Sequence, residues 1–258
     1  HDVIGVGGMA IVYKAYDNID DRIVAVKVLK DEYLANEEFR RRFKNESKAI
    51  AVLSHPNIVK VFDVSFGDLI QYIVMEYIEG ITLKEYIEER GVIDWKESLF
   101  FMNQILKALQ HAHDKGIVHR DIKPDNIFIS RFGEYKLGDF GIARKLEATQ
   151  ANLSRKGTLN YMAPEVYKSE PYGSNVDIYS LGLVLYTLLN NNRIAFLPPY
   201  PQQITYSDNE AALAQRLSGA PLPPPCNASA SLAAAIVKAC AYNPQERYQT
   251  ATEFKNAL

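Results

Sequence analysis

The sequence contains little cysteine and no excess of charge of either sign. Its 258 residues include two cysteines, Cys226 and Cys240, which match no CxxC or zinc-binding spacing. We therefore expect two reduced thiols, as in a cytosolic protein, rather than a disulfide. The formal net charge of -2 lacks the basic excess of nucleic-acid-binding proteins, so we expect no nucleic-acid partner.

Long hydrophobic runs and export signals are also missing. No run of about 18 apolar residues is present, so we expect no membrane-spanning segment. Residues 1–4 (HDVI) have the composition of a strand rather than the charged-then-apolar pattern of a signal peptide. The sequence therefore looks like a trimmed domain, expected in the cytoplasm and without membrane contact of its own. The alternative is the cytoplasmic domain of a membrane-anchored protein.

The pattern of the sequence changes near residue 80. Before it, short β-branched runs predict strands, and apolar residues at helical spacing predict one helix over 36–53. After it, amphipathic patterns predict helices, including a nearly apolar and therefore buried helix over 175–191. We expect a small β-rich lobe at 1–78 and a larger helical lobe at 79–258, with a ligand cleft between them.

Other segments are less regular. The runs at 55–64 (HPNIVKVFDV) and 69–78 (LIQYIVMEYI) predict two more strands. Most of the 12 prolines lie between residues 190 and 226, around a helical patch at 209–217. We interpret this region as an ordered surface insertion, with a disordered linker as the alternative.

Two motifs in the β-rich part suggest phosphate binding. Residues 5–12 (GVGGMAIV) form a glycine-rich turn that lets backbone N–H groups face phosphate oxygens, although a β-turn without a ligand explains it equally well. Ala10 stands where a G-x-G-x-x-G pattern has its third glycine. Lys27 ends the run VAVK and either faces phosphates or extends to solvent. Glu46, on the following helix, either pairs with Lys27 or is a solvated charge.

The motif at 119–126 (HRDIKPDN) is more specific. Asp121 can accept the proton of an attacking hydroxyl, and Lys123 can neutralise a moving phosphoryl group. Asn126 offers an amide oxygen to a metal ion, and Asp139 of GDFG offers a carboxylate. These are ligands that Mg²⁺ accepts together with phosphate oxygens, and Mn²⁺ is the alternative ion. His119 is expected to support the loop from the core rather than carry a proton.

The order of these motifs resembles the eukaryotic-like protein kinase family over essentially the whole chain. The resemblance continues with GT at 157–158, APE at 163–165, DIYSLG at 177–182 and Arg247. The runs GGMAIVYKA and HPNIVKVFDV are most similar to bacterial Ser/Thr kinases of this family. The resemblance implies an α+β fold, with a small antiparallel β-rich N-lobe containing one helix and a larger helical C-lobe.

The resemblance also implies roles for individual residues. Lys27, braced by Glu46, would hold the α- and β-phosphates of ATP, Asn126 and Asp139 would hold Mg²⁺, and Asp121 would deprotonate the acceptor hydroxyl. Met75 would control access behind the adenine. The remaining nucleotide contacts are expected at Gly5, Val6, Gly7, Gly8, Val12, Ala25, Phe128 and the backbone of Glu76 and Ile78.

The substrate class and regulation follow from the same resemblance. Lys123 in DIKPDN matches kinases that phosphorylate Ser and Thr, and Thr158 is expected to favour such acceptors. Glu165 is expected to pair with Arg247, and Asp177 to anchor the catalytic loop. Arg120 offers a forked site for a phosphate. From this we expect autophosphorylation in the activation segment, at Thr149 or Ser154, with self-association for reaction in trans.

Two rival functions remain open at this point. A pseudokinase would use the same fold as a scaffold, but such proteins usually lose the lysine or one of the aspartates that are present here. A small-molecule phosphotransferase of related fold typically lacks the GT and APE motifs. Protein substrates with Ser or Thr acceptors are therefore the expected partners.

Overall fold

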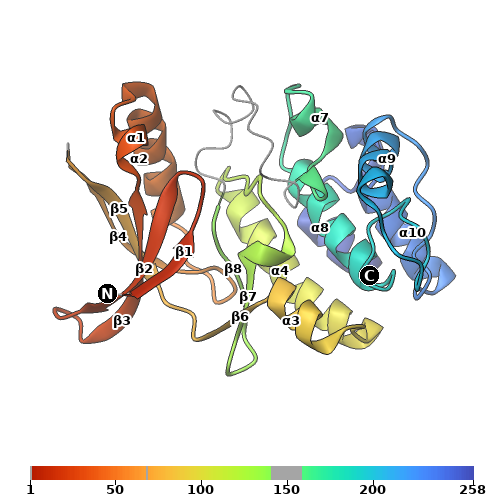
Figure 1. Cartoon of the computed structure of the whole chain (residues 1–258), viewed down its shortest axis with the longest axis horizontal. Helices are drawn as coiled ribbons and strands as arrows, with labels where there is room; N and C mark the ends of the chain where they lie inside the picture. Colours follow the sequence, from red (N-terminus) through yellow and green to blue (C-terminus); the bar gives the residue numbers. More distant parts are fainter. Residues whose placement is uncertain (1, 68, 141–158) are drawn as a thin grey trace.

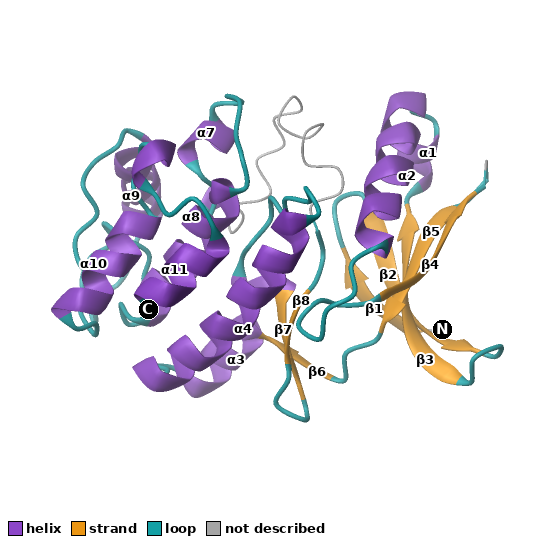
Figure 2. Cartoon of the chain, turned by 180° about the vertical axis from the view of Figure 1, so that it is seen from behind, coloured by secondary structure: helices purple, strands orange, loops and turns teal. Residues whose placement is uncertain are grey.

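The computed structural model describes residues 2–67, 69–140 and 159–258, and the side chains of Arg42 and Glu46 also lie outside this description. Thr149, Ser154 and Thr158 fall in the remaining range, so the expectations about them stay predictions. Figure 1 shows a β-sheet with one long helix on the left, a bundle of helices on the right, and a small sheet between them. Figure 2 shows from behind that the larger sheet lies at one end of the molecule and the small sheet nearer its middle.

The N-lobe is a five-stranded antiparallel sheet in the order β1-β2-β3-β5-β4. Its strands are rich in Val, Ile and Tyr, which suit a pleated, half-buried surface. The register places Val12 opposite Lys27 and Ala25 opposite Met75, so predicted nucleotide-site residues share neighbouring strands. The strands are β1 Asp2–Val6, β2 Ala10–Asp17, β3 Arg22–Leu29, β4 Val61–Phe66 and β5 Gln71–Glu76.

The predicted N-lobe helix is α2, Glu37–Ala51. The side chain of Asn36 caps its start by accepting a hydrogen bond from the backbone N–H of Phe39. Phe39 and Phe43 are 3% and 0% exposed, so one face of the helix packs into the core. A four-residue helix, α1 (Asp31–Leu34), precedes it and was not expected from the sequence.

The predicted strand at 55–64 begins only at Val61, so its first half was assigned wrongly. Instead, the N–H of Leu137 donates to the carbonyl of Asn57 (2.8 Å), and the N–H of Val59 donates to the carbonyl of Leu137 (2.9 Å). Residues 57–59 therefore pair with the C-lobe sheet, while β4 pairs with the N-lobe sheet. The hydrophobic periodicity of the sequence cannot reveal this change of partner strand, because pairing with either sheet requires the same apolar residues.

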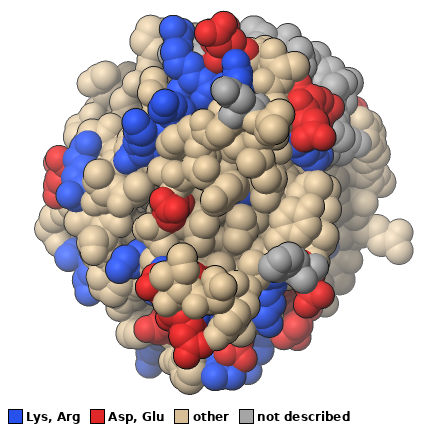
Figure 3. Space-filling model, turned by 90° about the vertical axis from the view of Figure 1, so that its left-hand side faces the viewer, with Lys and Arg blue, Asp and Glu red and all other residues tan. Residues whose placement is uncertain are grey.

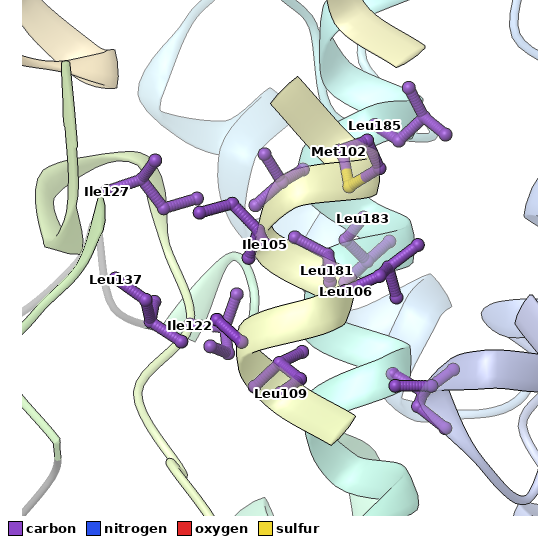
Figure 4. Close-up of a cluster of buried hydrophobic side chains, with 14 of the residues drawn as sticks. Met102, Ile105, Leu106, Leu109, Ile122, Ile127, Leu137, Leu181, Leu183 and Leu185 are labelled. Atoms are coloured by element: carbon purple, nitrogen blue, oxygen red, sulfur yellow. The ribbon is translucent and has the colours of Figure 1, made fainter. Parts of the chain in front are cut away.

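The C-lobe combines a three-stranded antiparallel sheet, β6-β7-β8, with helices around α8. Every residue of α8 is buried, as its apolar sequence predicts. Figure 4 shows α4 between α8 and the segment carrying Ile127 and Leu137. The elements are β6 Gly80–Thr82, α3 Leu83–Arg90, α4 Trp95–Asp114, η1 Pro124–Asn126, β7 Ile127–Ser130, β8 Tyr135–Leu137, α7 Pro164–Tyr167, α8 Asn175–Leu188, α9 Tyr206–Leu217, α10 Ala230–Ala239, η2 Pro244–Glu246 and α11 Ala251–Ala257.

The proline-rich segment is ordered, as expected. Arg193 holds it by donating from Nη1 to the carbonyl of Pro198 (2.5 Å) and from Nη2 to the carbonyl of Gln202 (2.6 Å). Helix α9 begins three residues before the predicted patch, because Thr205 and Asp208 form a capping box.

The predicted ion pair between Glu165 and Arg247 is present and buried. Arg247 donates from Nη1 to Glu165 Oε1 (2.6 Å) and from Nη2 to Oε2 (2.9 Å), a two-bond arrangement. The side chains are 4% and 0% exposed, so neither charge is solvated. The pair ties α7, in which the predicted activation segment (residues 139–165) ends, to the residues between η2 and α11.

The outer face of the N-lobe sheet carries few charges at its middle (Figure 3). Exposed apolar side chains on β1 to β3 include Val3, Ile4, Tyr16 and Ile23. No helix within the described ranges has the length and apolar character needed to cross a bilayer.

We expect the substitution Arg247→Met to lower the free energy of unfolding by about 3–5 kcal/mol, because it leaves the Glu165 carboxylate buried without a partner. Chemical denaturation measures this change. The exposed pair between Arg131 and Glu79 is the matched control, and Arg131→Met should cost less than about 1 kcal/mol. Adding Glu165→Gln to Arg247→Met should recover part of the lost stability. An equal loss of stability in Arg247→Met and Arg131→Met would contradict the argument.

Candidate active site

The catalytic loop, residues 119–126, is anchored by Asp177 at the start of α8. Its carboxylate accepts the backbone N–H of His119 at Oδ2 (2.7 Å) and that of Arg120 at Oδ1 (2.8 Å). His113 Nε2 lies 2.9 Å from the same Oδ2 and completes the set. Burial alone would raise the pKa of Asp177, but these donors outweigh it and lower the pKa, so the group is ionised. The predicted anchoring role of Asp177 is thus confirmed.

His119 is completely buried and supports the loop, as expected. Its Nδ1 accepts the N–H of Asp121 (3.2 Å), so Nε2 carries the proton and donates to the carbonyl of Gly138 (2.8 Å). Burial lowers the pKa of His119 despite the nearby carboxylates, which keeps the ring neutral. The neutral ring of His119 therefore holds both the carbonyl of Gly138, which precedes Asp139, and the N–H of Asp121.

Two of the predicted catalytic residues, Asp121 and Lys123, lie together with the predicted metal ligand Asn126. Asn126 Nδ2 donates to Asp121 Oδ2 (3.0 Å) and to the Asp121 carbonyl (2.7 Å). Lys123 Nζ lies 3.5 Å from Asp121 Oδ2. The Asp121 carboxylate is thus aimed by an amide and flanked by an ammonium, which suits a group that must accept a proton in one fixed direction.

Lys27 and Asp139 form an ion pair across the cleft. Partial desolvation of the carboxyl group raises the pKa of Asp139, but the Lys27 ammonium outweighs this effect and the pKa is lowered. Asp139 adopts a positive φ of 54°, as does Arg120 at 68°, so both motifs keep backbone strain at the site. Glu46 lies on α2, but its side chain is outside the description, so its pairing with Lys27 stays a prediction.

The glycine-rich turn closes the N-lobe side of the site. The N–H of Gly7 donates to the carbonyl of Ala10 (2.9 Å), and Lys30 Nζ donates to the carbonyl of Gly8 (2.9 Å). Ala10 is 1% exposed and pairs with Leu29, so the residue in the third glycine position belongs to β2. The turn between Val6 and Ala10 therefore stays short and is tied to β3 and its exit.

The predicted adenine contacts come from β2, β3, β5 and β7 and from the connector after β5. Val12 and Ala25 lie on β2 and β3, and Phe128 lies on β7 beside Gly138. A Cβ on Gly138 would stand 2.7 Å from the Phe128 ring, which explains the glycine before Asp139. The N–H and carbonyl of Ile78 bond to none of the described residues, so both remain available to a ligand.

Glu76 is more constrained than the sequence indicated. Its N–H donates to the carbonyl of Lys60 (2.8 Å), which leaves only its carbonyl for a ligand. Its side chain receives Lys136 Nζ at Oε1 (2.7 Å) and the N–H of Lys60 at Oε2 (3.2 Å). Sequence reasoning missed Lys136, because an isolated lysine in a strand carries no signal of a partner 60 residues away.

A cavity of about 30 Å³ lies behind Met75. The wall of this cavity also includes Lys27 from β3, Ile50 from α2 and Phe140. Met75 of β5 thus lines this cavity, and its control of access behind the adenine stays a prediction.

The donors present fit a hard divalent ion. Asn126 turns its amide nitrogen to Asp121, and its amide oxygen accepts no hydrogen bond from the described residues. The side chain of Asp139 is 48% exposed, so a carboxylate oxygen can reach an ion in the cleft. No cluster of three or more His, Cys, Asp or Glu in the described part of the chain could hold a metal alone. An ion here therefore needs further oxygens, such as those of phosphate.

We expect Lys27→Met to raise the pKa of Asp139, because the partial desolvation of its carboxyl group then acts without the opposing ammonium. Carboxyl ¹³C NMR titration of Asp-labelled protein measures this. In the wild type, the pair contributes stability at neutral pH, which is lost as the pH falls through the lowered pKa of Asp139. Lys44→Met, which removes an ammonium over the Phe66 ring instead, is the control and should leave this pKa unchanged. An unchanged pKa in Lys27→Met would contradict the assigned cause.

Sequence and structure comparisons agree with this geometry. Residues 1–257 match the protein kinase domain family. The Serine/threonine-protein kinase PrkC of Bacillus subtilis is 43% identical over 255 residues, covering 98% of this chain and 38% of the relative. The Serine/threonine-protein kinase PknB of Mycobacterium tuberculosis is 36% identical, covering 100% of this chain and 41% of the relative. The chain therefore spans well under half of these relatives.

Solved structures give the same result. The crystal structure of the Mycobacterium tuberculosis PknI kinase domain superposes with a TM-score of 0.72 at 27% identity, covering 99% of this chain and 92% of that one. The predicted fold and the predicted likeness to bacterial Ser/Thr kinases are thus confirmed. The chain belongs to the protein kinase domain family and is similar to its bacterial Ser/Thr members.

Proposed function

We propose that this chain is a catalytic domain that transfers the γ-phosphate of ATP to Ser or Thr hydroxyls of protein substrates. The observation that carries the proposal is the pair of Lys27 with Asp139 across the cleft, together with the contacts of Asn126 and Lys123 to the Asp121 carboxylate. Names of the relatives support the Ser/Thr class.

The chemistry follows from what each side chain offers. Asp121, aimed by Asn126, accepts the proton of the acceptor hydroxyl as the oxygen attacks phosphorus. Lys123 and Lys27 bring positive charge to the oxygens of the transferred group and of the phosphates behind it. Bound Mg²⁺, or Mn²⁺, would neutralise phosphate charge next to Asn126 and Asp139. The N–H groups of residues 5–8 would cover the phosphates, and Val12, Ala25 and Phe128 would enclose the adenine.

The wider assignments rest on the same reasoning. We place the division between the lobes at residues 78 and 79, within the connector that carries Ile78. Family members use ATP and a divalent metal and act on proteins, so the partners of this chain are protein substrates. A cytoplasmic location fits this activity, either for a free enzyme or for the cytoplasmic part of a membrane-anchored one.

A scaffold function is the second candidate. Such scaffolds usually lose a residue that binds nucleotide or accepts the proton, whereas Lys27, Asp121, Asn126 and Asp139 are all retained here. The Lys27 and Asp139 ion pair also favours a site organised for catalysis. Retention of the whole set therefore favours the enzyme.

We expect Asp121→Asn to lower the rate of phosphoryl transfer by roughly 10²- to 10⁴-fold, because the proton acceptor is lost. Incubation with ATP and Mg²⁺, followed by intact mass and peptide mapping, measures the transfer to Ser or Thr. Asp125→Asn is the matched control from the same loop, since Asp125 pairs with Lys84 (3.4 Å) away from the reacting groups. ATP binding with no transfer by the wild type to itself or to a basic protein would support the scaffold instead.

We expect active enzyme to carry phosphate on Thr149 or Ser154, where Arg120 could hold it. Mass spectrometry of protein incubated with ATP tests this. Mixing wild type with tagged Asp121→Asn protein shows whether one copy modifies another, since the variant cannot modify itself efficiently. Fully active enzyme with both residues unmodified would overturn the proposed regulation.

A further inference from the structure

Lys136, in the middle of β8, is a buried lysine that the proposed chemistry does not use. It is 9% exposed, and its Nζ donates to Glu76 Oε1 at the end of β5, where the connector begins (2.7 Å). Lysines are rarely buried unless their charge is paired, so the position of Lys136 depends on this carboxylate. The two residues lie 60 positions apart in the sequence, and their contact joins the C-lobe sheet to the N-lobe sheet.

Glu76 is held by hydrogen bonds from two elements. Besides the Lys136 ammonium, its carboxylate accepts the N–H of Lys60 at Oε2 (3.2 Å). Its own N–H donates to the carbonyl of Lys60 (2.8 Å). The side chain and the N–H of Glu76 are thus both occupied. Its carbonyl is the group left for the exocyclic amine of adenine, which is a hydrogen-bond donor.

The strand that carries Lys136 is also connected to three predicted site residues. Lys136 lies opposite Phe128, a predicted adenine contact, in the register of β7 and β8. Asp139 follows three residues later in the chain, and the N–H of the intervening Gly138 donates to the carbonyl of Asn126 (3.0 Å). One predicted adenine contact and both predicted metal ligands are therefore tied to β8, and Lys136 links this strand to the connector.

A second ion pair, between Glu79 of the connector and Arg131 of the turn after β7, reaches the same small sheet, which lies between the N-lobe sheet and the helices (Figure 1). Its side chains are 58% and 57% exposed, so water screens the two charges and the pair contributes little. The side chains of Glu76 and Lys136 are only 28% and 11% exposed. Of the two pairs, the shielded one is therefore able to fix the connector.

We propose that Lys136 is a positioning residue for the base of ATP: by holding the Glu76 carboxylate, it sets the Glu76 carbonyl where it accepts the exocyclic amine of adenine. The inference rests on the proposed kinase function, because it requires ATP to bind between the connector and Phe128. A buried ion pair is often no more stabilising than apolar side chains of similar size, so the advantage of this pair lies in the geometry that it imposes. Loss of the pair should therefore weaken recognition of the amine in particular.

The test compares the binding of ATP with that of purine riboside triphosphate, which lacks the exocyclic amine, by titration calorimetry with Mg²⁺. We expect the wild type to prefer ATP, and Lys136→Met to lower this preference about three- to tenfold, because one hydrogen bond is no longer well placed. In kinetic assays, KM for ATP should rise while kcat stays within about twofold. Arg131→Met, which removes the exposed pair with Glu79, is the matched control and should leave the preference unchanged.

A second variant tests whether Lys136 acts through Glu76. Glu76→Gln keeps the backbone carbonyl but removes the charge that Lys136 holds, so it should lower the preference for ATP as Lys136→Met does. The double variant should lower the preference no further, because both changes break the same contact. Should Lys136→Met not fold, Glu76→Gln decides the question.

The outcomes separate this inference from the kinase function. An unchanged preference for ATP in the variants would overturn the inference, as would equal weakening of both nucleotides, which is expected if the pair serves only the fold. A wild type that binds both nucleotides equally well would also overturn it, even if that protein transfers phosphate. A wild type that binds neither nucleotide would contradict the kinase function, and the inference with it.

Discussion

The carboxylate of Asp177 is the contact on which the arrangement of the site depends. It sits at the start of α8, the most deeply buried helix, and holds the N–H groups of His119 and Arg120. Since a buried carboxylate must be satisfied by donors, the two N–H groups and His113 are fixed with it. The loop that carries Asp121, Lys123 and Asn126 is thus fixed to the helical core through Asp177.

Hydrogen bonds to backbone groups connect the anchored catalytic loop to the predicted nucleotide side of the site. The ring of His119 links the N–H of Asp121 to the carbonyl of Gly138, directly before Asp139. Strand β8 in turn pairs with residues 57–59. Glu76, through Lys136 and Lys60, connects the same strand to the start of the connector. The cleft is therefore lined by elements that are hydrogen-bonded to one another from both lobes.

Charge is distributed so that each buried ion has a defined task. Glu165 and Arg247 neutralise each other and fix α7. Arg216 instead donates hydrogen bonds to neutral carbonyls. Lys27 and Asp139 neutralise each other at the cleft, where the Asp139 side chain is 48% exposed. The pair of Glu165 and Arg247 is thus closed to solvent, whereas the pair at the cleft is open to solvent at Asp139.

The sequence by itself determined most of the elements and the residue types of the motifs, although it missed α1 and began one strand too early. Helix α8 was evident from its apolar residues, and HRDIKPDN with GDFG identified Asp121, Asn126 and Asp139, because their order within a short segment leaves few other uses. The tertiary structure decided the partners: Arg216 with the loop 159–162, Lys136 with Glu76, and residues 57–59 with β8. These contacts join residues far apart in the chain through single side chains or peptide groups. Such pairings leave no periodic pattern, because they depend only on where the folded core brings the two partners together.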